Sequence, residues 1–455
     1  MKVIIVGAGE VGYHIASKLS RENKDVVLID RGEDRLRYVS ESLDVQTLLG
    51  SGSSPGLLLQ AGIKSADMIV AVTDSDESNL VACLLSRILS PGTTRIARIR
   101  NPEFFQMEEL KREEILGLNL VINPESEVVH AIMRLLQVPG AVDVVDFADG
   151  RVRLIGLKIS GDSHLVGRSM IDIQRDDPER HVLVAAIHRD NDVIIPYGQT
   201  RIKAGDLVYV VTRPTDVEDV LRFFDLVWHP VRNVFIVGGG QVGSQLARQL
   251  EENGKGKIKL IDQNPDRCRA LGQSLNKTVV LKGDGTDQTL LEEENVADAD
   301  FFIALTNDEE ENVLSCLLAK RLGARQTITR VNKFAYIPLV TAIGLETLVS
   351  SRLSAVSAIL RNIRRGKVMS AAALKGEEAE VLEFEALQTS DIVGRPLAES
   401  KFPKQALIAA VVRGNDVIIP RGDTVINPKD RIIVLARREA IPKVEKVFSV
   451  KLEFF

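Results

Sequence analysis

The chain has 455 residues, of which 45% are hydrophobic, 27% charged and 4% aromatic, and its formal net charge is −5. This length exceeds what one ordinary hydrophobic core can organise, so three or four domains are expected. The negative charge and the scarcity of aromatic rings argue against a nucleic-acid-binding protein, which needs cations for phosphates and rings for stacking.

The first predicted element, residues 3–6, is a buried strand rather than a signal sequence, because glycines from Gly7 onward interrupt the apolar run at once. No run in the chain approaches the roughly 18 apolar residues that span a bilayer. The three cysteines, Cys83, Cys268 and Cys316, show no CxxC spacing, as expected in a reducing cytosol. Cys83 and Cys316 lie on apolar helix faces and are interpreted as core residues.

The first 123 residues alternate between short apolar runs and amphipathic segments such as 14–20 and 79–89. Runs of this kind are typical of buried parallel strands with helices between them. The fold class predicted is therefore α/β, a Rossmann-like doubly wound parallel sheet. The predicted strands are 3–6, 26–29, 45–49, 68–72, 96–99 and 120–122.

Residues 125–136 continue as a helix, and after it the apolar pattern changes to period two. Segments 182–187, 193–195 and 207–211 alternate in this way and are separated by turn residues. A small α+β domain is predicted here.

The whole arrangement occurs twice. KVIIVGAGEVG at 2–12 recurs as NVFIVGGGQVG at 233–243, and 181–211 recurs as 405–435. Four ordered matches of this kind indicate an internal duplication. The predicted organisation is a nucleotide-binding domain at 1–123, a linking helix at 124–142, a small domain at 143–227, a second nucleotide-binding domain at 232–348, a second linking helix at 349–367 and a second small domain at 368–453.

Each large repeat opens on a GxGxxG loop between a strand and a helix, with an acid at the end of the next strand. Gly7 permits a tight turn, Gly9 lets a pyrophosphate approach the helix N-terminus, and Gly12 lets the helix pack against the sheet. Asp30 and Asp262 are placed to accept hydrogen bonds from ribose hydroxyls. The alternative is a Rossmann shell that binds nothing.

Other candidates follow the third, fourth and fifth strands of each repeat, where open α/β sheets place ligands. Arg31 is compatible with a ribose phosphate or with a plain exposed loop, and Arg98 with a phosphate or with a neighbouring acid. Asn79 and Asn312 open a helix, as capping residues do. The candidate binding residues are Gly7, Ala8, Gly9, Glu10, Val11, Gly12, Asp30, Arg31, Ser51, Gly52, Thr73, Asp74, Arg98, Gly238, Gly239, Gly240, Gln241, Val242, Gly243, Asp262, Asp284, Gly285, Thr306, Asn307 and Arg330.

Catalytic groups are missing from this set. None of the six histidines has a counterpart in the other repeat or a recognisable catalytic setting, and no Walker lysine, HExxH or nucleophile elbow occurs. Ligand binding without turnover is the better-supported interpretation, and neither a catalytic nor a metal site is predicted.

The string GAGEVG, Asp30, the small loop after the third strand, VTDSDESNL at 72–80 and IARI at 96–99 resemble the RCK (KTN) domain, which regulates potassium conductance. The small domains look like the RCK C-terminal subdomain. This resemblance covers essentially the whole chain. It implies NAD(H) and also ATP or ADP as ligands, and a homotetramer that forms an eight-domain ring on the cytosolic face of the inner membrane. The implied partner is a potassium-translocating membrane subunit, and the ring is implied to change shape with nucleotide occupancy.

One position departs from the RCK pattern, which has an acid after the glycine of the third-strand loop. The second repeat keeps it as Asp284, whereas the first has Ser51. The two sites are therefore expected to differ in nucleotide preference or affinity. The competing functions are an NAD-dependent oxidoreductase and a regulator of another cation transporter or antiporter.

Overall fold

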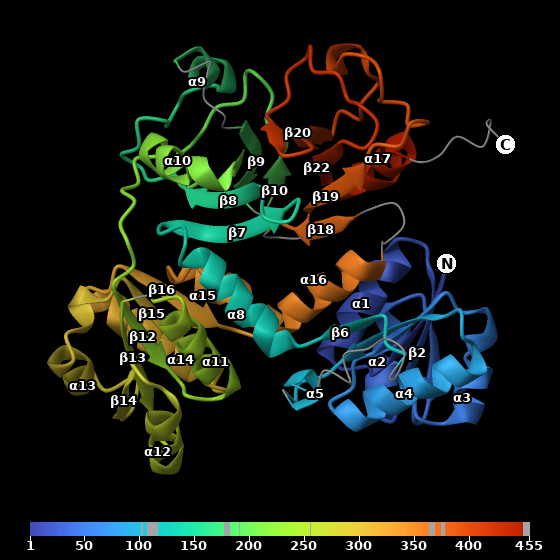
Figure 1. Ribbon diagram of the computed structural model, residues 1–455, viewed down its shortest axis with the longest axis horizontal. Coiled ribbons are helices and arrows are strands. Elements are labelled where there is room, and N and C mark those ends of the chain that lie inside the picture. Colours follow the sequence, from blue (N-terminus) through green and yellow to red (C-terminus); the bar gives the residue numbers. More distant parts are fainter. Residues whose placement is uncertain are drawn as a thin grey trace. The chain divides into compact units, whose positions relative to one another are not determined.

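The computed structural model in Figure 1 describes residues 1–101, 103–106, 117–176, 183–190, 192–254, 256–363, 369–374 and 378–448. The ends predicted for the second linking helix (364–367) and the last domain (449–453) lie outside these residues. The chain forms two compact units: Met1–Val128 with Ser350–Ile363, and the remainder. Among the described residues, no helix combines the length and apolar content that a membrane crossing requires.

The first unit is built on a six-stranded parallel sheet of order β3-β2-β1-β4-β5-β6. Successive strands are added on one side of β1 up to β3 and on its other side from β4 onward. The boundary between β1 and β4 is therefore the switch point of a doubly wound sheet. This confirms the predicted Rossmann-like class. The strands are β1 (Lys2–Val6), β2 (Asp25–Asp30), β3 (Gln46–Leu49), β4 (Met68–Ala71), β5 (Thr94–Arg98) and β6 (Leu120–Ile122).

Separate apolar cores cover the two faces of this sheet. One contains residues of α1 and α2, and the other contains residues of α3 and α4. Helices on both faces explain why the strands are apolar throughout rather than alternating. The helices are α1 (Glu10–Arg21), α2 (Glu33–Ser42), α3 (Pro55–Gln60), α4 (Asp76–Leu89) and the short α5 (Glu103–Gln106).

Helix α16 (Ser351–Ile363), from the second half of the chain, completes the first core. Its Ala355 and Ile359 are fully buried in the same cluster as Ile15 and Leu19 of α1. The sequence of this linking helix does not by itself predict that it packs against the first domain. The first nucleotide domain therefore buries its α1 face only because a segment over 300 residues later returns to it.

The second unit contains a second parallel sheet of order β14-β13-β12-β15-β16-β17, the same topology as the first. The predicted duplication is thus confirmed at the level of the fold. Its strands are β12 (Asn233–Val237), β13 (Lys257–Asp262), β14 (Val279–Lys282), β15 (Phe301–Ala304), β16 (Gln326–Arg330) and β17 (Leu348–Val349). Its helices are α11 (Gln241–Glu252), α12 (Pro265–Ser274), α13 (Gln288–Glu293), α14 (Glu309–Arg321) and α15 (Ile337–Ala342).

Each small domain is a five-stranded antiparallel sheet, and the two orders, β10-β9-β11-β8-β7 and β18-β19-β22-β20-β21, are equivalent. The strands are β7 (Ala141–Phe147), β8 (Val152–Lys158), β9 (Leu183–Arg189), β10 (Asp192–Ile194), β11 (Leu207–Thr212), β18 (Ser370–Ala373), β19 (Ala379–Glu385), β20 (Ala406–Arg413), β21 (Asp416–Ile418) and β22 (Arg431–Arg437). The helices of this part are α8 (Pro124–Leu135), which precedes β7, then α9 (Met170–Asp176), α10 (Val217–Phe223) and α17 (Ile441–Phe448).

The two small domains share one core within the second unit. Tyr209 and Phe147 of the first are buried in the same cluster as Val381 and Ala410 of the second. The Ala148 amide also donates to Glu383 Oε2 at 3.2 Å. Sequence comparison detected the repeat but could not show that its copies pack on each other.

Candidate functional site

Two candidate sites lie where the loops leave the carboxyl ends of the parallel strands. We call the residues after β1–β5 the first candidate site and those after β12–β16 the second candidate site. Both contain the switch point of their sheet, at which doubly wound folds bind ligands. No ligand is needed to define them, because the backbone geometry of each loop is already specific.

The glycine loop of the first site forms a tight turn before α1. Gly7 has a φ of 111°, and its amide donates to Ile29 O at 2.8 Å, which closes the turn. A Cβ at Gly12 would collide with the Gly7 carbonyl oxygen, so this glycine is needed for close packing. A Cβ at Gly9 would instead meet nothing within 4 Å. The α1 N-terminus is therefore open on the Gly9 side.

The second glycine loop repeats this geometry position by position. Gly238 has a φ of 98°, a Cβ on Gly243 would collide with Gly238 O, and Gly240 faces open space. Neither Gly9 nor Gly240 provides a side-chain cap, so the amides of α1 and α11 keep their N-terminal hydrogen-bonding capacity. Unsatisfied amides and the positive end of the helix dipole together favour an anion at each N-terminus.

The other residues of the loops contribute backbone rather than side chains. Ala8 and Val11 are buried, as is Val242 in the second loop, and their side chains belong to the cores. Glu10 is half exposed and forms an ion pair with Arg352 of α16. The corresponding Gln241 carries no charge, so it cannot form the equivalent ion pair.

Asp30 holds the glycine loop in place. Its Oδ2 accepts a hydrogen bond from the Ala8 amide at 2.6 Å and its Oδ1 accepts one from the Gly32 amide at 2.7 Å. A carboxylate has about four lone-pair sites, so both oxygens can also accept ribose hydroxyls. The structure thus adds a positioning function to the ribose contact expected from the sequence.

Asp262 makes the equivalent bonds, from the Gly239 amide at 2.7 Å and the Asn264 amide at 2.8 Å. Arg267 of α12 adds a contact at 2.9 Å. Burial opposes ionisation of Asp262, but these hydrogen bonds and the Arg267 charge outweigh it and lower the pKa of the carboxyl group.

The arginine beside each acid was missed in the sequence analysis. Arg35, in the first turn of α2, lies 3.7 Å from Asp30 Oδ1, and Arg267 is its counterpart in the second repeat. The signal was present, since RGEDR (31–35) aligns with QNPDR (263–267) and the last arginine is common to both. Each acid therefore faces a cation on the following helix.

The third-strand loops are similar in shape and different in charge. Ser51 Oγ accepts from the Ser53 amide at 3.2 Å, and Asp284 Oδ1 accepts from the Thr286 amide at 2.7 Å. Hydrogen bonds from Thr286 lower the pKa of Asp284. The replacement of an acid by Ser51 preserves the turn and removes a negative charge.

Gly52 and Gly285 are required by the protein itself rather than by a ligand. A Cβ on Gly52 would collide with Val6 at the end of β1, and one on Gly285 with Val237 at the end of β12. Each glycine therefore lets the third-strand loop lie directly over the first strand.

Asn79 does not cap its helix, so that expectation was wrong. The caps are Ser75, which accepts from the Ser78 amide, and Asp308, which accepts from the Glu311 amide. Asn79 is fully buried. Its Oδ1 accepts from the Thr73 amide at 2.9 Å and hydroxyl at 2.7 Å, and its Nδ2 donates to Arg98 O at 2.8 Å.

Asn312 makes the same contacts with Thr306 and with Arg330 O. Each asparagine therefore joins the loop after the fourth strand to the end of the fifth. Thr73 and Arg98 are held together through Asn79, as Thr306 and Arg330 are through Asn312.

The arginines at the ends of the fifth strands each contact a neighbouring polar side chain. Arg98 Nη1 lies 3.7 Å from Asp74 Oδ1, which supports the ion-pair alternative, although Asp74 is 84% exposed. Burial lowers the pKa of the Arg98 guanidinium, with the nearby Arg100 adding to the effect. Arg98 Nε is buried and has no hydrogen-bond partner within the described part of the chain. In the second site the neighbour of Arg330 is the neutral Asn307, at 3.4 Å.

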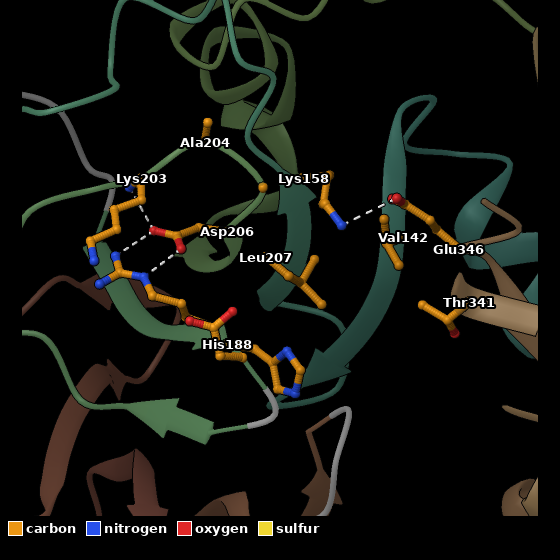
Figure 2. Close-up of a pocket in the computed structure, with 12 residues that line it drawn as sticks. Val142, Lys158, His188, Lys203, Ala204, Asp206, Leu207, Thr341 and Glu346 are labelled. Carbon is orange, nitrogen blue, oxygen red and sulfur yellow. Dashed lines mark hydrogen bonds and ion pairs between the residues drawn. The ribbon is translucent and has the colours of Figure 1, made fainter. Parts of the chain in front are cut away.

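A separate cavity of about 320 Å³ lies in the second unit, between the first small domain and the α15 region (Figure 2). Figure 2 shows Lys158 pointing toward Glu346. Lys158 Nζ lies 3.2 Å from Glu346 Oε1, and Arg189 Nη2 lies 2.7 Å from Asp206 Oδ2. The arginine–aspartate pair recurs as Arg413–Asp430 in the second small domain. We therefore interpret this ion pair as a structural feature of the small domain. The cavity is lined by both cationic and acidic side chains.

Comparison with known proteins agrees with this geometry. The TrkA-N domain family matches residues 3–124 and 234–351, and the TrkA-C domain family matches 154–225 and 381–449. The Trk system potassium uptake protein TrkA of Halomonas elongata is 38% identical over 459 residues, covering 100% of both chains.

Among solved structures, the GsuK channel bound to NAD aligns with a TM-score of 0.60 and 19% identity, covering 98% of this chain and 78% of that one. The GsuK RCK domain aligns with a TM-score of 0.59 and 19% identity, covering 98% and 94%. These likenesses confirm the duplicated RCK fold that the glycine loops and small domains predicted. The Halomonas elongata relative is named as a Trk system potassium uptake protein. The chain belongs to the TrkA family of Trk system potassium uptake proteins.

Proposed function

We propose that the protein is a nucleotide-binding regulatory subunit of a Trk-type potassium uptake system. The observation that carries this proposal is the pair of open helix N-termini at Gly9 and Gly240, each held in place by an aspartate at the end of the next strand. An anionic group with a ribose on one side fits such a site. NAD(H) is the proposed ligand of both sites, with ATP or ADP as alternatives.

The candidate residues take different parts in this proposal. Amides at the N-termini of α1 and α11 bind the pyrophosphate, and Asp30 and Asp262 accept the ribose hydroxyls. Arg98, whose Nε is buried without a partner among the described residues, faces a phosphate from the fifth strand. The proposed division places the nucleotide domains at 1–123 and 232–348 and the small domains at 143–227 and 368–453.

The membrane partner is proposed from the family. The relatives are named as Trk system potassium uptake proteins, and one structural neighbour is described as a channel bound to NAD. We propose a potassium-translocating partner of the TrkH or TrkG type, contacted on the cytosolic face of the inner membrane by a tetramer with eight RCK units. Nucleotides regulate such a ring only if they bind its conformations with different affinity.

The test uses two glycines that tolerate a side chain. Gly9→Asp and Gly240→Asp each place a carboxylate at one helix N-terminus, where it repels a pyrophosphate without a steric clash. Gly272→Asp, at an exposed position of α12 with open space around its Cβ, is the matched control. Calorimetry with NADH should show one binding event lost in each single variant, a weakening of about tenfold or more.

Both events should be lost in the double variant and kept in the control. Potassium uptake is then measured in a strain that lacks this protein and carries each variant. The double variant should not restore uptake at low external potassium. Unchanged NADH and ATP binding in the double variant would contradict the proposed sites, and normal uptake without the protein would contradict the proposed role.

A further inference from the structure

At four equivalent positions the second candidate site carries one positive charge fewer or one negative charge more than the first. The first position follows the aspartate at the end of the second strand, and the second follows the glycine of the third-strand loop. The third is the N-cap of the helix after the fourth strand, and the fourth lies three residues beyond that cap. They carry a formal charge of +1 in the first site and −3 in the second. The residues are Arg31, Ser51, Ser75 and Ser78 in the first site, and Gln263, Asp284, Asp308 and Glu311 in the second.

In the first site the positive charge is anchored. Arg31 directly follows Asp30, and its Nη2 donates to Ser51 Oγ at 2.8 Å. Its guanidinium is thereby held between the second- and third-strand loops, beside the place where the adenosine ribose is expected. Both oxygens of Asp30 already accept backbone amides, from Ala8 and Gly32. Arg31 is thus an exposed cation next to the ribose position, in addition to Arg35, which has a counterpart in the second site.

In the second site the equivalent region is acidic. Gln263 replaces the arginine, and its amide nitrogen lies 3.2 Å from Glu311 Oε1. Burial raises the pKa of Glu311, and the carboxylates of Asp284 and Asp308 raise it further. Asp284, Asp308 and Glu311 therefore form an acidic region, and a phosphate group bound beside it would be repelled by these carboxylates.

Other charged groups do not cancel this difference. Arg35 and Arg267 face the acid of their site, and Arg98 and Arg330 lie at the end of the fifth strand of each sheet, so both pairs are common to the two sites. Asp74 and Glu10, which the second site replaces with Asn307 and Gln241, have the opposite effect. Asp74, however, is 84% exposed and lies beside Arg98, and Glu10 is paired with Arg352. Glu33, near Arg31, is paired with Arg37.

We propose that the two sites sort dinucleotides by the charge on their adenosine ribose. The first site accepts a dinucleotide that carries a phosphate on this ribose, whereas the second excludes it and takes the unphosphorylated form. An arginine beside the ribose is the feature with which Rossmann domains accommodate a 2′-phosphate. This inference rests on the proposed function of both sites as nucleotide sites.

The experiment compares NADPH with NADH at each site of the full-length protein. Gly240→Asp leaves the first site available and Gly9→Asp leaves the second. The quantity measured by calorimetry is the ratio of the NADPH and NADH dissociation constants. We expect this ratio to be at least about tenfold larger at the second site, and the difference to shrink in roughly 0.5 M salt because exposed charges are screened.

Charge swaps assign the effect to the named residues. Arg31→Gln should raise the ratio at the first site by about tenfold. The matched control is Arg21→Gln, which removes the same charge at the far end of the 12-residue α1 and should leave the ratio unchanged. Gln263→Arg combined with Asp284→Ser and Glu311→Ser should lower the ratio at the second site.

Equal ratios at the two sites, or no effect of Arg31→Gln, would overturn the sorting while leaving the nucleotide sites intact. Absence of NADH binding at both sites of the unaltered protein would instead contradict the proposed function, and this inference with it. The two failures are therefore distinguishable.

Discussion

Truncation of Asn79 tests the idea that one buried side chain organises the first site. Asn79→Ala removes the acceptor of the Thr73 amide and the donor to Arg98 O, at 2.9 and 2.8 Å. The Thr73 hydroxyl retains a second contact, to Ser75 O at 3.1 Å, and can adapt. Asn79 Nδ2 also donates to Thr73 O at 3.1 Å, so three backbone groups lose this partner in a region where Asn79 is fully buried.

The magnitude follows from the cost of unpaired buried groups. Each unsatisfied backbone donor or acceptor costs about 1–3 kcal/mol, and some water entry reduces the sum, so we expect a local loss of about 2–4 kcal/mol. We expect the loss to be confined to the first nucleotide domain, because the side chain of Asn79 bonds Thr73, after β4, and Arg98, at the end of β5. Nucleotide affinity at the first site should fall as well, since Thr73 and Arg98 lose their common anchor.

Hydrogen exchange read by mass spectrometry is the appropriate assay, because it reports the stability of each segment separately. Amides of β4 and β5 should lose protection in Asn79→Ala, and those of β15 and β16 should lose it in Asn312→Ala. Asn276→Ala, at an exposed position, serves as the control. A change below about 1 kcal/mol in β4 and β5 would refute the reasoning, because it would show that the loop does not depend on this side chain.

Three further outcomes are expected. Gly12→Ala should strongly destabilise the first domain in thermal unfolding, because its Cβ meets a carbonyl oxygen, whereas Gly9→Ala should unfold like the unaltered protein. The pKa of Glu251 is lowered to about 2: burial opposes ionisation, but hydrogen bonds from three backbone amides and a threonine hydroxyl outweigh it. Because the folded pKa lies below the ordinary 4.5, ionised Glu251 stabilises the protein above that pH, and its advantage over Glu251→Gln in urea unfolding should vanish as pH falls toward 2. Burial raises the pKa of Cys83 and Cys316 to about 12, so a thiol reagent at pH 8 should modify neither before unfolding, and rapid labelling would contradict their place in the core.

Much of the candidate site could be predicted from the sequence because its elements are local. A glycine loop between a strand and a helix, with an acid at the end of the next strand, lies within about 30 residues, and each glycine has a steric reason. Gly7 forms the expected turn and Gly12 allows the expected close packing, whereas the pyrophosphate contact at Gly9 stays a prediction. Roles that depend on contacts between distant segments were less predictable. Asn79 was expected to cap a helix and instead joins two strand ends, and the arginines beside the two acids were overlooked.

The sequence by itself determined the fold class, the duplication and the two glycine loops. It could do so because hydrophobic periodicity and turn residues are properties of short segments, and because the same pattern occurs in both halves of the chain. Only the tertiary structure decided that α16 completes the core of the first unit, that the small domains share one core, and that Arg31 is anchored on Ser51. These arrangements depend on which apolar surfaces meet and which side chains face each other across loops, and that information is distributed over the whole chain. The sequence shows that Ser51 stands where the second repeat has Asp284. Only the fold shows that Arg31 contacts Ser51 in the first site and that Gln263 contacts Glu311 in the second.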